Sequence, residues 1–388
     1  MGNEIQKEGL MGLARLMKMA FDGIDLAPIG EALIRRAEAE AKDAEALMDL
    51  SVVLQLRQNR HLALDVQRQA LATKILYHLP ATGKPAVRLL AIMAPGDLMT
   101  NTPLEFLVEG SDISLHMLYV GEGLPPAPKL PEHDLVFIAV GESTKSDPLL
   151  EELSQVSWSK PVLNRPADIL KASREAAPVH LAKVPGLFIP EARRVSRQAL
   201  LSLRNFPFIA RPIDSHAGQG LERMENPEQT AAYLDRMSDS EFYVSPFIDY
   251  RSSDGLYRKY RVALIDGRPY AAHMAISANW MIHYANVGMI DSPEKRQEEE
   301  RFMNNFDADF ASRHREAFKG IYEGLGLDYV VLDCAETKEG KLLVFEADTG
   351  AVVHAMDQAD IFPYKSPQMR KVFAAFRQML LGAMRAGT

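Results

Sequence analysis

Cysteine is almost absent from this chain of 388 residues. The single cysteine, Cys334, excludes an intramolecular disulfide and any metal site that needs several thiolates. So little cysteine is typical of proteins in reducing compartments, where disulfides do not persist. We therefore expect a cytoplasmic protein.

The chain also lacks long hydrophobic runs and an excess of basic charge. No run approaches the roughly 18 consecutive apolar residues that a membrane-spanning helix needs. The 44 lysines and arginines are outnumbered by 52 aspartates and glutamates, which gives a formal net charge of −8. Binding to nucleic acid needs a clustered basic surface. The composition therefore predicts neither a membrane nor a nucleic acid as partner.

The first 82 residues show helical periodicity and no strand pattern. Within Asp43 to Thr73, small and apolar residues stand where a tetratricopeptide unit places its packing residues, namely Leu47, Leu50, Leu54, Ala63 and Ala70. A stable solenoid normally needs three or more such units, and about one and a half are present. The sequence predicts a helical module over residues 1–82. It is either a tetratricopeptide-like unit that packs on the next domain or an ordinary helical hairpin.

Residues 83–190 alternate short apolar runs with turns that are rich in glycine and proline. The runs are Val87–Met93, Leu115–Val120 and Leu135–Val140. Short buried runs separated by helical segments are typical of a small open α/β sheet. We expect this range to be a second domain.

The remaining residues, 191–388, predict a third domain of helices and paired strands. Asn226 is placed to cap a helix, and Asp266-Gly267 is a strong hairpin turn. Further strands are expected at Phe206–Ile213, Glu241–Ile248, Tyr329–Glu336 and Lys341–Asp348. Together the three ranges predict a protein of the α/β (α+β) class.

The last two expected strands carry an acidic signal. If they are joined by a two-residue turn at Lys338-Glu339, Asp333 lies opposite Val344. Side chains alternate along a strand, so Asp333, Glu346 and Asp348 would point to one face of the sheet. Carboxylates gathered in this way could share divalent cations, and oxygen ligands favour Mg²⁺ or Mn²⁺. The alternative is a solvated acidic face, although the apolar residues along both strands favour a covered one.

A second signal points to phosphate. Arg211, on an expected strand, precedes a flexible segment whose backbone amides could surround an anionic group together with this cation. The segment consists of Ser215, His216, Ala217, Gly218, Gln219 and Gly220. The alternative is an ordinary turn, because a Gly-x-Gly segment alone is a weak signal.

In this order the segments resemble the ATP-grasp superfamily, which includes glutathione synthetase, D-alanine–D-alanine ligase and the RimK-type glutamate ligases. The matching segments are Phe208-Ile209-Ala210-Arg211-Pro212, Ser215–Gly220, Phe242–Asp249, Tyr260-Arg261-Val262, Asp333 and Glu346-Ala347-Asp348. The resemblance covers roughly residues 160 to 360 and depends on order and spacing. It implies an ATP-grasp fold over residues 191–388, preceded by the small α/β domain and the helical module.

The resemblance implies how a nucleotide would bind. Arg211 would contact the phosphates of ATP, and the segment Ser215–Gly220 would close over them as a lid. The stretch Ser245-Pro246-Phe247-Ile248 would meet the edge of the adenine through the Pro246 carbonyl and the Ile248 amide. Asp254 would reach the ribose hydroxyls.

The resemblance also implies the groups that act on the transferred phosphoryl group. Arg261 would contact it, and the three carboxylates on the last two strands would hold Mg²⁺. Family members usually have asparagine where Asp348 stands and lysine where Arg211 stands. They also have another lysine near the position of Arg174, and in this chain Arg174 would take the place of that lysine. Arginine is larger and planar, so these exchanges are not neutral.

The activity implied is that of an ATP-dependent carboxylate–amine ligase. ATP and Mg²⁺ or Mn²⁺ are the expected cofactors, and the substrates would be a small-molecule carboxylate or peptide and an amine, joined through an acyl phosphate. The replaced lysines suggest an alternative, a catalytically degenerate ATP-binding scaffold that recruits a protein partner through its helical module. A phosphotransferase that leaves phosphate on its product is a third interpretation.

Overall fold

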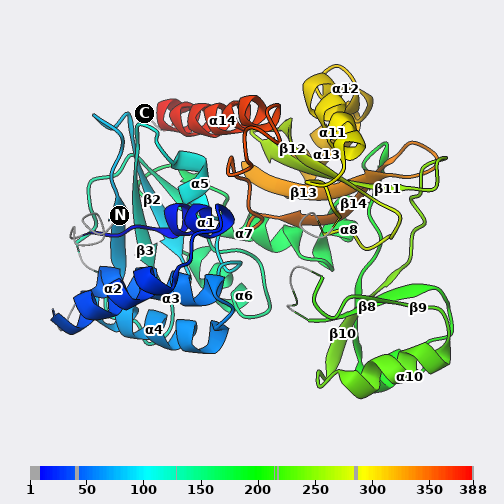
Figure 1. Ribbon diagram of the computed structural model, residues 1–388, viewed down its shortest axis with the longest axis horizontal. Helices are drawn as coiled ribbons and strands as arrows, with labels where there is room; N and C mark the ends of the chain where they lie inside the picture. The colour runs from blue at the N-terminus through cyan, green and yellow to red at the C-terminus, as the bar shows by residue number, and fades with distance from the viewer. Residues whose placement is uncertain are drawn as a thin grey trace.

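The computed structural model describes residues 9–39, 43–127, 129–213, 215, 218–283 and 287–386. Within these residues the strands form three sheets, with helices packed around them (Figure 1). The protein is thus of the α/β class that the sequence predicts. None of the described helices combines the length and apolar character needed to cross a bilayer.

The chain begins with a group of helices that have their own apolar core. They are α1 (Leu13–Phe21), α2 (Ala27–Ala39), α3 (Ala44–Leu56) and α4 (Arg60–Thr73). Asp43 caps α3 by accepting a hydrogen bond from the Ala46 amide at 2.8 Å. Ala63 and Ala70 are completely buried. Whether α3 and α4 form a tetratricopeptide-like unit stays a prediction.

The first sheet has the order β1-β3-β2-β4-β5. Its strands are β1 (Leu76–Leu79), β2 (Val87–Met93), β3 (Ile113–Tyr119), β4 (Leu135–Ile138) and β5 (Val162–Leu163). Strands β2 to β5 are parallel, and the small open α/β sheet is present as predicted. However, β1 pairs antiparallel with β3 and lies inside the range predicted to be only helical. That part of the prediction was wrong, because β1 is short and depends on a distant partner strand.

Short helices connect and follow the strands of the first sheet. They are α5 (Leu104–Val108), α6 (Asp147–Leu153), α7 (Pro166–Ile169), the 3₁₀ helix η1 (Leu170–Ala172) and α8 (Ala176–His180). The turn between η1 and α8 carries Arg174. This turn therefore positions the arginine that the sequence singled out.

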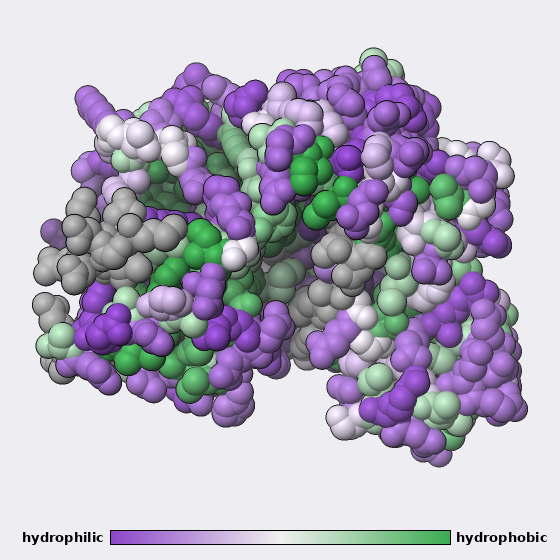
Figure 2. All heavy atoms as spheres, in the orientation of Figure 1, coloured by the Kyte–Doolittle hydropathy of each residue, from purple (hydrophilic) through white to green (hydrophobic). Residues whose placement is uncertain are grey.

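The second sheet, with the order β7-β10-β8-β9, forms a separate lobe (Figure 1). Its elements are β7 (Arg193–Ser196), α9 (Arg197–Leu201), β8 (Phe208–Pro212), β9 (Glu222–Met224), α10 (Pro227–Arg236) and β10 (Glu241–Pro246). Phe208, Tyr233 and Phe242 form its apolar core. The space-filling view shows a notch between this lobe and the N-terminal half of the molecule (Figure 2).

The third sheet has the order β12-β11-β13-β14-β6. Its strands are β6 (Leu187–Phe188), β11 (Tyr257–Ile265), β12 (Arg268–Ser277), β13 (Tyr329–Glu336) and β14 (Leu342–Asp348). The associated helices are α11 (Pro293–Asn305), α12 (Phe310–Arg313), α13 (Arg315–Leu325) and α14 (Lys365–Ala386). Although β6 precedes residue 190, it pairs with β14 and so belongs to this sheet.

The C-terminal helix α14 joins the first sheet to the third. The ring of Phe376 on α14 lies 5.9 Å from that of Phe137 on β4 and 5.6 Å from that of Tyr329 on β13. The first and third sheets therefore share one apolar core. The domain ranges 1–82, 83–190 and 191–388 stay a prediction.

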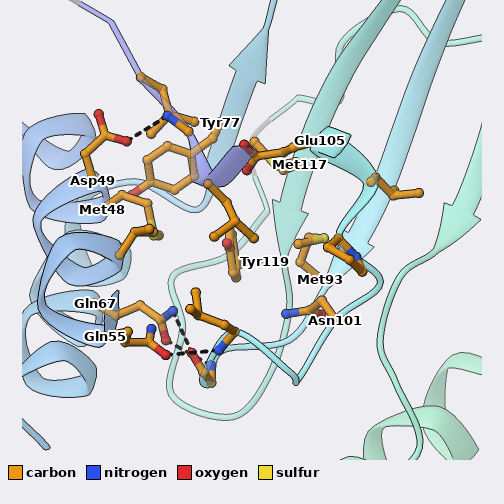
Figure 3. A pocket seen from close by; sticks show the side chains of 18 of the residues that line it. Met48, Asp49, Gln55, Gln67, Tyr77, Met93, Asn101, Glu105, Met117 and Tyr119 are labelled. Carbon is orange, nitrogen blue, oxygen red and sulfur yellow. Dashed lines mark hydrogen bonds between the residues drawn. The ribbon is translucent and has the colours of Figure 1, made fainter. Parts of the chain in front are cut away.

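A cavity of about 60 Å³ lies between the N-terminal helices and the first sheet (Figure 3). Two carboxyl groups at its wall hold the start of α1. Asp49 accepts hydrogen bonds from the Met11 and Gly12 amides at 2.7 and 2.9 Å, and Glu105 accepts one from the Ala14 amide at 3.1 Å. The Ala14 amide belongs to the first turn of α1, where no backbone partner exists, and the Met11 and Gly12 amides lie directly before this turn.

Burial raises the pKa of both Asp49 and Glu105 to about 7. An unfolded chain releases these protons near pH 4, so between pH 4 and 7 the folded protein binds more protons than the unfolded one. Stability therefore falls as pH rises through this window. Between pH 5.5 and 8 we expect a loss of about 2 kcal/mol for each group.

Urea unfolding measured across this pH range checks the prediction. The double variant Asp49→Asn/Glu105→Gln should lose most of the pH dependence that the wild type shows. Glu109→Gln is the control, since Glu109 follows Glu105 closely in sequence and is exposed. Parallel pH profiles for the wild type and the double variant would contradict the assignment.

Candidate functional site

The hairpin that joins β13 to β14 is one residue longer than predicted. The Thr337 amide donates to the Lys341 carbonyl at 2.9 Å, and Gly340 takes a left-handed φ of 76°. This is a three-residue loop with a glycine at its end, rather than the predicted two-residue turn. Taken alone, the extra residue would have turned the later side chains of β14 to the opposite face.

A β-bulge on β14 cancels that change. The register shifts after Asp333, where Phe345 is the extra residue, so Asp333 lies opposite Glu346 and not opposite Val344 as predicted. Asp348 follows two residues after Glu346 and so points to the same side. Asp333, Glu346 and Asp348 therefore share one face of the sheet, through two shifts that compensate each other.

Asp333 is held by two cations from the neighbouring strand β11. Arg261 donates from Nε to Oδ1 at 2.8 Å and from Nη2 to Oδ2 at 3.0 Å, and Lys259 Nζ lies 2.7 Å from Oδ2. The Arg261 Nη1 group also donates to the Val352 carbonyl at 3.2 Å. Burial by itself would raise the pKa of Asp333, but Arg261 and Lys259 outweigh it and hold that pKa far below its usual value. Asp333 is thus ionised at neutral pH.

Glu346 and Asp348 differ in their environment. Glu346 accepts a short hydrogen bond from Arg174. Burial raises the pKa of Glu346, but the charges of Arg174 and Arg211 lower it by a larger amount, so the resulting pKa lies below its usual value. Asp348 accepts a hydrogen bond from the Gly350 amide at 2.6 Å. Burial and the charge of Glu346 raise its pKa, so Asp348 is the carboxyl group of this face that most readily takes up a proton.

Arg211 and Arg174 bring the second and third sheets into electrostatic contact. Arg211 lies on β8, and its pKa is lowered to about 10 by burial and then by the charge of Arg174, while Glu346 on β14 raises it. Arg174 donates to Glu346 itself. Arg174 therefore contacts this carboxylate directly, and Arg211 acts on it electrostatically from the second sheet.

The predicted lid follows Arg211 directly. Arg211 donates from Nε to Ser215 Oγ at 3.0 Å and from Nη2 to the Ser215 carbonyl. Gly218 and Gly220 have left-handed φ values of 75° and 65°. The Gly220 carbonyl accepts a hydrogen bond from the Tyr233 hydroxyl at 2.8 Å, which fixes the far end of the lid. Gln219 lies between the glycines, and His216 and Ala217 lie outside the described residues.

The predicted adenine-binding stretch is the end of β10 and its continuation. Ser245 and Pro246 pair with β8, which brings them onto the same sheet as Arg211. The Phe247 ring lies 3.8 Å from the Arg223 guanidinium and packs edge-on against Trp280 at 5.6 Å. Ile248 packs against the apolar cluster around Tyr250. The stretch therefore places Phe247 and Ile248 among aromatic and apolar neighbours, next to the sheet that carries Arg211.

Asp254 lies in the loop before β11 and forms an ion pair with Arg258 at 2.7 Å. Arg258 also contacts Glu298 on α11. Nothing in these contacts links Asp254 to the carboxylates of β13 and β14, so its role at the ribose stays a prediction.

Sequence reasoning missed Lys259 as a partner of Asp333. The signal was available, because Lys259 stands two residues before Arg261 on the same strand, and residues at that spacing point to the same face. The contact of Arg261 with the Val352 carbonyl carried no comparable signal.

The oxygen donors of Asp333, Glu346 and Asp348 are of the kind that bind Mg²⁺ or Mn²⁺. As they lie, however, they do not form a ready ligand set, since cations of the chain occupy Asp333 and Glu346. Among the residues that the structure describes, no three histidine, cysteine or acidic side chains are grouped closely enough to hold a metal ion. The three carboxylates share a face, and two of them, Asp333 and Glu346, are paired with lysine and arginine.

Comparison with known proteins gives no sequence relative. No family model matches the chain, and no curated protein matches it significantly. Solved structures do resemble it, and three are ligases or contain an ATP-grasp domain. One is the D-Ala:D-Ser ligase VanG from Enterococcus faecalis, with 12% identity, 77% of this chain and 99% of that chain covered and a TM-score of 0.47. Another is a RimK domain ATP-grasp protein from Sphaerobacter thermophilus, with 18% identity, 76% and 99% covered and a TM-score of 0.44. The third is D-alanine–D-alanine ligase from Bacillus anthracis complexed with ATP, with 15% identity, 78% and 99% covered and a TM-score of 0.45.

Proposed function

We propose that this protein is an ATP-dependent ligase that joins a carboxylate to an amine. One observation carries the proposal: Glu346 on the third sheet accepts a hydrogen bond from Arg174 in the turn between η1 and α8. Arg211 on the second sheet lies within electrostatic range of both groups. Asp333 with Arg261 and Lys259 lies beside them. A cluster of fixed cations and carboxylates suits a polyphosphate better than an uncharged ligand.

The proposed reaction has two steps. A substrate carboxylate oxygen attacks the γ-phosphorus of ATP, which releases ADP and gives an acyl phosphate. An amine then attacks the acyl carbon, and the products are an amide, inorganic phosphate and a proton. Phosphoryl transfer depends mainly on positioning and on charge stabilisation, and the cations of the site supply both.

Each segment has a part in this proposal. Arg211 and the backbone of the lid would hold the phosphates, and the stretch Ser245–Ile248 would hold the adenine. Arg261 would face the transferring phosphoryl group, since it is fixed by two hydrogen bonds to Asp333. The acid and amine would be small molecules or a peptide, and a divalent cation, Mg²⁺ or Mn²⁺, is proposed on the chemistry of the three carboxylates alone.

Calorimetry with a non-hydrolysable ATP analogue tests the nucleotide part. We expect one site per chain with a dissociation constant in the micromolar range, which is usual for enzyme ligands. ADP release is then measured with mixtures of amino acids and small acids as substrates, and at least one acid with one amine should raise it tenfold. The absence of analogue binding in folded protein would refute the proposal.

A second candidate is an ATP-binding scaffold without turnover, which recruits a partner through the N-terminal helices. The observation in its favour is that Ile34 and Leu62, on the surface of α2 and α4, are 43% and 45% exposed. The same assay separates the two functions. A scaffold binds the analogue but shows no increase in ADP release with any acid and amine.

A further inference from the structure

Resting on the ligase proposed above, we infer that helix α1 positions Arg261 for its contact with the terminal phosphoryl group of the nucleotide. Helix α1 acts through the post-β14 segment, which is formed by residues 350–357. The beginning of this segment is bonded to the charged side chains of the site, and α1 packs on its middle. The inference gives the N-terminal helices a part in nucleotide binding within their own chain.

The post-β14 segment contacts the site through its backbone. The Val352 carbonyl accepts a hydrogen bond from Arg261 Nη1 at 3.2 Å, and the Gly350 amide donates to Asp348 Oδ1 at 2.6 Å. Arg261 also donates from Nε and Nη2 to Asp333. Val352 therefore holds the nitrogen of the guanidinium that Asp333 does not hold, so its position helps to orient the whole planar group.

Helix α1 packs on the same part of the segment. Ala14 on α1, Phe106 on α5 and Met356 in the segment form one apolar cluster, and they are 5%, 3% and 5% exposed. The side chain of Val352 packs against this cluster. The residue whose carbonyl holds Arg261 is thus itself held by the contact with α1.

The conformation of the segment depends on such side-chain contacts. All of its residues are described, and none belongs to a helix or a strand. The ring of Phe21, at the end of α1, lies 5.7 Å from that of His354, and the ring of Phe106 lies 6.5 Å from it. A segment without regular backbone hydrogen bonds opens at low cost when its packing contacts are lost.

Helix α1 is a fixed support, because other elements hold its beginning. Asp49 on α3 accepts hydrogen bonds from the Met11 and Gly12 amides, and Glu105 on α5 accepts one from the Ala14 amide. Figure 1 shows α1 beside α5. Weakening the contact between α1 and the segment should therefore release the segment and leave the helix in place.

ATP and ADP should respond differently to this release. Arg261 is proposed to face the terminal phosphoryl group, which ADP lacks. When Val352 moves, Arg261 keeps its bonds to Asp333 but loses one contact that orients it, and charge-assisted hydrogen bonds to phosphate depend on orientation. Loss of the α1 contact should weaken binding of an ATP analogue and leave ADP binding unchanged.

Met356→Ala tests the inference, since it removes a side chain through which the segment meets α1. In calorimetry without metal, we expect the non-hydrolysable ATP analogue to bind at least tenfold more weakly and ADP to bind within twofold of the wild type. Hydrogen exchange followed by mass spectrometry should be at least tenfold faster over residues 350–357. Met356→Leu, which keeps most of the volume, should restore both values to within twofold.

Met48→Ala is the matched control. Met48 is also 5% exposed, but it packs in the larger core around the first sheet, so its loss should change neither the exchange of the segment nor the ratio of analogue to ADP affinity. Phe21→Ala repeats the test if Met356→Ala does not fold. Phe21 is 45% exposed, so we expect a smaller loss of analogue affinity, at least threefold.

A double variant shows whether the effect passes through Arg261. Arg261→Lys keeps the charge, but a single ammonium group cannot reproduce the contacts with both Asp333 and the Val352 carbonyl. In this background, Met356→Ala should lower analogue affinity less than twofold, because the coupled contact is already lost. A tenfold loss in both backgrounds would place the effect elsewhere and overturn the inference.

The remaining results separate this inference from the ligase proposal. If analogue and ADP affinities fall equally in Met356→Ala, or if neither falls, α1 only stabilises the fold and the inference is wrong. If the wild type binds neither nucleotide, the ligase proposal fails and the exchange data decide about α1. Unchanged exchange in Met356→Ala then overturns its hold on the segment, and faster exchange over residues 350–357 supports it.

Discussion

Asp333→Asn is expected to lower the free energy of unfolding by about 3 kcal/mol, the low end of the range for breaking a buried ion pair. The substitution removes the negative charge that Arg261 and Lys259 share. An asparagine can accept through one oxygen only, so two cations would remain in a covered site without a full counter-charge. The low end applies because Lys259 can turn its ammonium group toward water.

Urea unfolding at pH 7 measures this effect, with Asp309→Asn as the matched control. Asp309 pairs with Arg313 at 2.7 Å, but 63% of its side chain is exposed, so its loss should cost no more than about 1 kcal/mol. An Asp333→Asn protein as stable as the control variant would show that the ion pairs of Asp333 contribute little.

The pH dependence gives an independent check on Asp333. Its folded pKa lies far below the unfolded value, so the stability that it contributes is present above about pH 4 and is lost as the solution becomes more acidic. Asp333→Asn should remove this contribution. The stability difference between the wild type and the variant should therefore shrink as pH falls from 5 to 2, and a constant difference would contradict the assigned charge state.

Local sequence signals predict local structure well in this chain. Asn226 caps α10 by accepting from the Gln229 amide at 2.9 Å. Asp266 and Gly267 take φ values of 49° and 74° in the turn between β11 and β12. Each feature depends on residues within three positions of each other, so no information about the tertiary fold is needed.

Features that depend on residues far apart in the chain could not be predicted from the sequence. The strand β1 exists because β3 offers it an edge, and its four residues carry too short a pattern to show this. The bulge at Phe345 returns Glu346 and Asp348 to the same face as Asp333, although no residue pattern predicts this bulge. The acidic face could thus be predicted, whereas the register that produces it could not.

The ion pairs of the site are the clearest example. Arg261 and Asp333 are 72 positions apart in the chain, and Arg174 and Glu346 are 172 apart. The sequence suggests which residues carry charge but not which charges neutralise each other. For this reason the predicted metal ligands Asp333 and Glu346 were not expected to be paired with cations, as they are in the structure.

Arg211→Met is expected to weaken binding of the ATP analogue about 100-fold. Hydrogen bonds to charged groups contribute roughly 1.5–3 kcal/mol, and a factor of 100 corresponds to about 2.7 kcal/mol within that range. Although burial and the nearby Arg174 lower its pKa to about 10, Arg211 remains charged at neutral pH. Calorimetry at pH 7.5 without metal measures the loss directly, and Arg236→Met is the control. Arg236 is 57% exposed and pairs with Glu222 on the outer part of the same lobe, so this variant should bind like the wild type.

Arg211→Lys distinguishes the charge from the shape of the guanidinium. Arg211 donates to both the hydroxyl and the carbonyl of Ser215, so it fixes the start of the lid as well as offering a charge to the nucleotide. Lysine keeps the charge but cannot make both contacts in one plane. We therefore expect it to recover about tenfold of the lost affinity, which is half of the lost free energy. Full recovery would mean that Arg211 serves only as a charge, and wild-type affinity in Arg211→Met would remove Arg211 from the nucleotide site.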